Sequence, residues 1–80
     1  MNIRQAHTFS NKVVDALIKE RQRKNITKYQ ISKTCGISEA ALSYIERHER
    51  HPTLYTLKMI ADAIDINLSD IIKDIENSSQ

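Results

Sequence analysis

The sequence predicts an all-α fold, a compact five-helix bundle that contains a helix-turn-helix. The 80 residues include one Gly and one Pro, so the chain has few breaks and long regular segments. Apolar residues recur at helical spacing in five segments, and capping residues separate these segments. A chain of this length makes one domain with a modest core. A deep catalytic cleft is therefore not expected.

The expected domain and its helices follow from the apolar spacing and from the capping residues. Residues 54–65 have the most regular spacing, which makes this helix the clearest of the five. We expect residues 9–76 to form the domain, residues 1–8 a flexible N-terminal arm and residues 77–80 a frayed C-terminus. The expected helices are residues 9–24, 28–35, 39–47, 54–65 and 68–76.

The second and third helices are short and are joined by a tight turn. Thr27 and Gln30 form a capping box pattern at the start of the second helix. Gly36 follows the last apolar residue, where a helix end adopts the left-handed conformation that glycine enters at low cost. Ser38 is then the N-cap of the third helix. Two short helices joined by a glycine-containing turn are typical of a helix-turn-helix.

The charges are distributed unevenly along the chain. Residues 1–35 carry eight basic and two acidic side chains, whereas residues 36–80 carry four basic and eight acidic ones. A polyanion could dock on the first half while the second half faces away from it. The alternative is an ordinary solvated helix surface, and charge alone leaves both open.

The sequence lacks the residue sets of an enzyme or a metal site. Cys35 is the only cysteine, so it is expected to be a small core residue, and His48 and His51 have no further ligands beside them. There is no nucleophile–base pair, pair of carboxylates or phosphate-cradling glycine loop. No enzyme activity, metal, cofactor or small-molecule ligand is expected. Without a signal peptide or an apolar run of about 18 residues, a cytoplasmic location is expected.

Several stretches resemble the lambda-repressor/Cro-like (Xre) helix-turn-helix domain. The resemblance covers about residues 10–76, with every element in order. It implies a five-helix bundle whose third helix lies in the major groove of DNA, usually as a dimer on a near-palindromic site. It also implies that Arg21 and Glu46 form a structural ion pair between the first and third helices. The stretches are ITKYQIS (26–32), CGIS (35–38), LSYIER (42–47), PTLYTL (52–57) and INLSDII (66–72).

Two groups of residues match positions of this family that contact the DNA backbone. Thr27 and Lys28, at the start of the second helix, match positions that clamp a phosphate with side chains and backbone N–H groups. Arg47 and Arg50, at the end of the third helix and in the following loop, match positions that touch the sugar-phosphate backbone.

The third helix carries the residues that the resemblance places in the groove. Ala40 and Ser43 are short enough to enter a major groove about 12 Å wide. The acidic Glu39 could accept a hydrogen bond from a cytosine amino group. The groove-facing positions, together with the N-cap of the helix, are Ser38, Glu39, Ala40, Ser43 and Tyr44.

The sequence departs from the family pattern at four positions. Lys28 stands where the family commonly has Gln, so a glutamine that buttresses base contacts is expected to be lost. Glu39 and Glu49 place acids near phosphates. His48 stands where Gly usually ends the third helix, which implies modest strain or a different loop path. We therefore expect binding that is less charge-driven and more sequence-dependent.

Two functions from different classes are consistent with the sequence. The first is a sequence-specific transcription regulator, a repressor of prophage or mobile-element type that binds a double-stranded DNA operator as a homodimer. Its dimer contact is expected on the last helix, through Leu68, Ile71, Ile72 and Ile75. The second is an antitoxin-like or adaptor module that binds another protein through the acidic helices 54–65 and 68–76.

Overall fold

The computed structural model describes residues 2–78 and places them in five helices with no strand. The all-α prediction is confirmed, and four of the five helices begin at the expected residue. The helices are α1 (Ile3–Arg23), α2 (Lys28–Cys35), α3 (Glu39–Glu46), α4 (Leu54–Ala63) and α5 (Leu68–Ser78).

The start of α1 corrects the sequence prediction, because the helix begins at Ile3 instead of near Phe9. Asn2 Oδ1 accepts from Gln5 N at 2.8 Å, and Gln5 Oε1 accepts from Asn2 N at 2.9 Å. This capping box satisfies two N–H groups locally, so the first turns need no contact with the core. Residues 3–8 are therefore exposed helix and not the expected flexible arm.

At the other end, α5 continues to Ser78, two residues beyond its expected end. Asn77 and Ser78, which were expected to fray, belong to this helix. The remaining residues of the expected arm and frayed end, Met1 and residues 79–80, lie outside the described residues.

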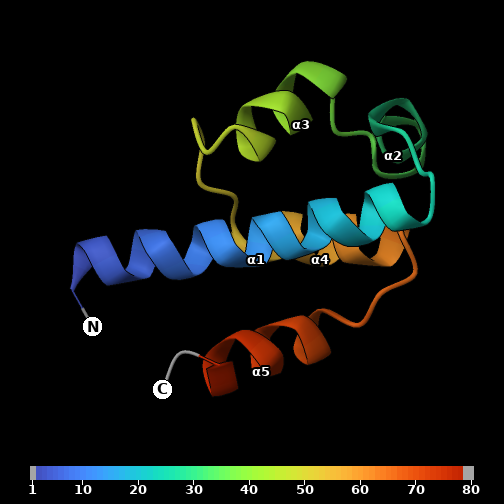
Figure 1. Ribbon diagram of the computed structural model, residues 1–80. Coiled ribbons are helices and arrows are strands. Elements are labelled where there is room, and N and C mark those ends of the chain that lie inside the picture. The colour runs from blue at the N-terminus through green and yellow to red at the C-terminus, as the bar shows by residue number, and fades with distance from the viewer. Residues whose placement is uncertain (1, 79–80) are drawn as a thin grey trace.

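α1 runs through the middle of the molecule (Figure 1). The pair α2 and α3 lies on one side of it and α5 on the other, with α4 packed beside α1. The first turn of α1 and the last turn of α5 lie at the same end. This arrangement leaves α3 at the outside of the bundle, away from α5, where a large partner can reach it.

The core takes apolar side chains from all five helices. Ala61 and Ile64, at the end of α4, are completely buried. This follows from the central place of α4, which packs against α1, α2 and α5. The buried apolar residues are Val13, Val14, Leu17, Ile31, Leu42, Ile45, Leu57, Ile60, Ala61, Ile64, Leu68 and Ile71.

The apolar residues of α5 belong to this core to a greater extent than expected. Leu68 and Ile71 are 7% and 9% exposed, and Ile72 and Ile75 are half-buried and pack against the core. Leu68 and Ile71 thus pack mainly within a single chain, which narrows the expected dimer contact. The reason is that α5 packs against both α1 and α4, so it needs a wide apolar face.

Three helix ends turn through a non-glycine residue in the left-handed region. Asn25, His48 and Asp65 have φ of 59°, 62° and 57°, whereas α2 ends at Gly36 with φ of 77°. The left-handed conformation is unfavourable for a residue that has a Cβ atom and not for glycine. Among the other residues, asparagine adopts it most readily.

We expect Asp65→Gly to stabilise the fold by about 0.5–1 kcal/mol, since glycine removes the left-handed strain after α4. Asp65 is exposed, so few packing contacts are lost. The measurement is the urea midpoint followed by circular dichroism at 222 nm. Asn25→Gly is the matched control and should gain less. A lower midpoint for Asp65→Gly would show that the aspartate side chain stabilises the turn.

No helix within residues 2–78 is both long enough and apolar enough to cross a bilayer.

Candidate nucleic-acid interface

Local capping fixes the N-terminus of α2 and the turn that joins α2 to α3. Thr27 Oγ1 accepts from Gln30 N at 3.1 Å, and Gln30 Oε1 accepts from Thr27 N at 2.8 Å. After α2 and Gly36, at the start of α3, Ser38 Oγ accepts from Ala41 N at 3.0 Å. A Cβ on Gly36 would meet no atom within 4 Å, so the need for glycine comes from its positive φ. These caps determine where α2 and α3 begin, and with that which residues of α3 are exposed.

The expected DNA-contact residues are accessible on the surface that α2, α3 and the following loop share. Lys28 and Ser43 are half-buried, and the others are exposed. The exposed ones are Thr27, Ser38, Glu39, Ala40, Tyr44, Arg47 and Arg50.

Lys28 and Ser43 are joined by a hydrogen bond between α2 and α3. Lys28 Nζ donates to Ser43 Oγ at 3.0 Å. The sequence placed Lys28 at a phosphate and Ser43 at a base, but the structure brings them together. Lys28, which stands where the family commonly has Gln, thus donates to a side chain that the family resemblance places in the groove.

Tyr44 holds two guanidinium groups over its ring. The Cζ atoms of Arg47 and Arg50 each lie 5.3 Å from the ring centroid, within cation–π distance. Arg47 also pairs with Glu49, with Nη2 and Oε2 2.9 Å apart. Glu49 is therefore partly neutralised by its neighbour, and its expected repulsion of phosphates is weaker than its charge suggests. The ring of Tyr44, which the sequence placed among the groove-facing positions, therefore also contacts both arginines.

The loop after α3 is tied to α1 at two points. His48 Nε2 donates to Asp15 Oδ1 at 2.8 Å, and the ring of His51 stacks on His7 with centroids 4.2 Å apart. The positive φ of His48 confirms that this helix end is strained. Both contacts hold the segment that carries Arg50. Within residues 2–78, no three side chains of His, Cys, Asp or Glu gather as metal ligands.

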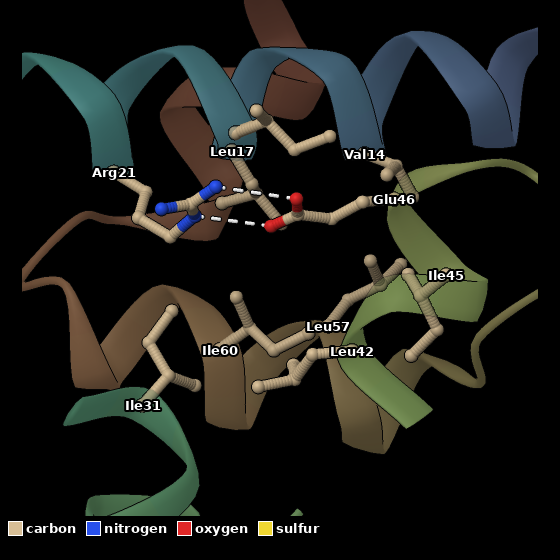
Figure 2. Close-up of a pocket in the computed structure, with 10 residues that line it drawn as sticks. Val14, Leu17, Arg21, Ile31, Leu42, Ile45, Glu46, Leu57 and Ile60 are labelled. Atoms are coloured by element: carbon tan, nitrogen blue, oxygen red, sulfur yellow. Dashed lines mark hydrogen bonds and ion pairs between the residues drawn. The ribbon is translucent and has the colours of Figure 1, made fainter. Parts of the chain in front are cut away.

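The expected pair between Arg21 and Glu46 is present as a bidentate ion pair (Figure 2). Arg21 Nε and Nη2 lie 3.0 and 3.2 Å from the two carboxylate oxygens of Glu46, and Nη1 donates to Ile26 O at 2.9 Å. The pair lies across apolar side chains of α1, α3 and α4 and lines a cavity of about 20 Å³, room for about one water. It thus joins α1, α3 and the loop before α2.

A family model described as helix-turn-helix matches residues 17–71, which include all of α2, α3 and α4. The chain belongs to the Cro/C1-type, Xre-like helix-turn-helix family. This is a family of DNA-binding regulatory domains, so this Xre-like domain is a DNA-binding domain of a transcription regulator. Comparison with curated proteins and with solved structures found no match.

Lys24 has a structural partner that sequence reasoning missed. In this Xre-like domain, Lys24 Nζ donates to the carbonyl oxygens of Ile64 and Asp65 at 2.7 and 3.1 Å. A cation at these carbonyls caps the end of α4, where the helix dipole is negative. Lys24, one of the eight basic residues in residues 1–35, therefore stabilises the fold. No local pattern could reveal it, because the partners lie 40 and 41 residues away.

Cys35 lies at the end of α2 and is half-buried. Its Sγ donates to Met59 O at 3.5 Å. Burial raises the pKa of the Cys35 thiol, and the nearby charge of Asp62 raises that pKa further. A thiol with a raised pKa is a poor nucleophile at neutral pH. This agrees with the packing role that the sequence predicted for Cys35 in the Xre-like domain.

Proposed function

We propose that this chain is a sequence-specific repressor that inserts α3 into the major groove of an operator. The observation that carries the proposal is the exposed row on α3 between two groups suited to phosphate. Glu39 and Ala40 begin the row and Tyr44 ends it. The origin in a prophage or mobile element rests on the family resemblance alone.

The N-terminus of α2 is the proposed phosphate contact on one side of the groove. The first N–H groups of a helix and its dipole favour an anion. Thr27 is exposed and its Oγ1 already accepts from Gln30 N, so its hydroxyl proton remains to be donated to a phosphate oxygen. On the other side, Arg47 and Arg50 are the proposed contacts, held by the ring of Tyr44.

The operator complex is proposed to contain a homodimer, and its contact surface is revised from the sequence prediction. An open groove is lined by Leu68 and Ile72 of α5 together with Leu54 and Lys58 of α4. Leu54 is 67% exposed, and a large apolar side chain left in water favours a protein contact. We therefore place the contact at the edge between α4 and α5, which lies away from α3.

The test is selection from random duplex DNA, followed by a salt titration on the selected site. A repressor should prefer one sequence about a thousandfold or more over non-specific DNA. Its affinity should also fall as the salt concentration rises. Binding without sequence preference would contradict the proposal and favour the protein-interaction module.

A protein-interaction module is less supported by the structure. It was expected to use the acidic side chains of α4 and α5. Asp62 of that surface pairs with Lys58, with Nζ and Oδ1 2.8 Å apart, which lowers the charge available to a basic partner.

A further inference from the structure

The hydrogen bond between Lys28 and Ser43 determines whether the serine hydroxyl acts as donor or acceptor in that bond. An ammonium group has three donors and no acceptor. In the 3.0 Å contact, Ser43 Oγ must therefore accept. The O–H group of Ser43 then remains free to donate a hydrogen bond to another acceptor.

A serine or threonine within a helix commonly donates that proton to the carbonyl four residues earlier. Thr8 and Thr34 of this chain do so, each at 3.0 Å, to Arg4 O and Gln30 O. Within residues 2–78, the structure shows no such bond from Ser43. Its hydroxyl proton is therefore available on the side of α3 that the proposed function places in the groove.

Lys28 adds positive charge and further donors beside this hydroxyl. Two of its three N–H groups remain after the bond to Ser43. Two donor groups thus lie 3.0 Å apart, one on α2 and one on α3. In the major groove, guanine presents two neighbouring acceptors, O6 and N7, whereas cytosine presents a donor and adenine one of each.

From this geometry we propose that Lys28 and Ser43 act as one donor pair that reads a guanine in the operator. The inference rests on the proposed function and goes beyond it, because it names the base. A serine alone bonds to donors or acceptors. The lysine removes that ambiguity, so Lys28 is a specificity-determining residue and not only a phosphate contact.

The experiment is a set of parallel selections with the full chain and three variants. Ser43→Ala removes one donor, and Lys28→Met removes the ammonium and keeps the length of the side chain. Lys33→Met is the matched control. Lys33 is also a lysine of α2, but it is exposed and its Nζ lies over the ring of Tyr29, which also belongs to α2. Circular dichroism and urea midpoints check that each variant is folded. Lys28→Gln replaces Lys28→Met if the latter does not fold.

We expect one guanine of each half-site to lose its preference in Ser43→Ala and in Lys28→Met, and to keep it in Lys33→Met. Replacing this guanine by 7-deazaguanine, which lacks the N7 acceptor, should weaken binding of the unsubstituted chain about tenfold. The same replacement should change binding of Ser43→Ala much less.

Three results would overturn the inference. In the first, both variants keep every base preference. In the second, Lys28→Met weakens binding equally on all sequences and lowers the salt slope by about one, as expected for a phosphate contact. In the third, the base that changes is not guanine. All three leave the proposed function intact if the unsubstituted chain selects an operator. If it selects none, the proposed function fails and the inference with it.

Discussion

Replacement of Glu46 by alanine is expected to lower the free energy of unfolding by about 2–3 kcal/mol. The reason is the charge left behind: Arg21 and Glu46 are 13% and 20% exposed, so Arg21 keeps a poorly solvated charge without its partner. The loss is smaller than for a fully buried pair because both side chains keep some contact with water. It is large beside the total stability of an 80-residue domain, about 4–12 kcal/mol. Urea unfolding followed at 222 nm measures it.

Two further variants show whether the loss comes from the unpaired charge. Arg21→Met combined with Glu46→Leu removes both charges and should recover most of the stability. Arg23→Ala breaks the pair with Glu20 on the surface of α1, whose side chains are 63% and 32% exposed, and should change stability by less than about 1 kcal/mol. If Glu46→Ala stays as stable as the unsubstituted chain but loses DNA binding, Glu46 is part of the interface and not of the scaffold.

The double substitution Arg47→Ala and Arg50→Ala is expected to weaken operator binding about 100-fold at low salt. Each arginine is proposed to contact a phosphate, so the slope of log affinity against log salt should fall by about two. The loss should be nearly equal on specific and non-specific DNA, because phosphates carry no sequence information. Fluorescence anisotropy over a salt series measures both quantities.

Controls for this prediction come from the same chain. Lys73→Ala removes an exposed cation on α5, away from the proposed interface, and should change affinity little. Tyr44→Leu removes the ring over which both guanidinium groups lie and should reproduce part of the loss, whereas Tyr44→Phe keeps the ring. Loss of preference at one base pair in the double variant would show that an arginine reads a base.

The sequence predicted α2 to α5 well because their ends depend on local chemistry. Thr27 caps a helix by bonding to an N–H three residues away, and Gly36 ends one through its own φ. The start of α1 was missed for another reason. The apolar stripe marks where a helix touches the core, not where it begins, and the polar capping box of Asn2 and Gln5 lies before the stripe. Attention to that pair would have located the helix start.

The contacts that shape the interface were not predictable from the sequence. Lys28 and Ser43 are 15 residues apart, and His48 and Asp15 are 33 apart. Their distances depend on how α2 packs against α3 and where the loop after α3 crosses α1. Packing angles depend on the shapes of many core side chains together, which no local pattern contains.

By itself, the sequence determined the helical class, the turn at Gly36 and the residues that α3 exposes, since periodicity and capping act over a few neighbouring residues. The tertiary structure decided the rest. It showed that Leu68 and Ile71 belong to the core of a single chain, and that the hydroxyl of Ser43 is left as a donor by Lys28. Burial and hydrogen-bond polarity are relations between side chains on different helices, so they exist only once the helices are packed.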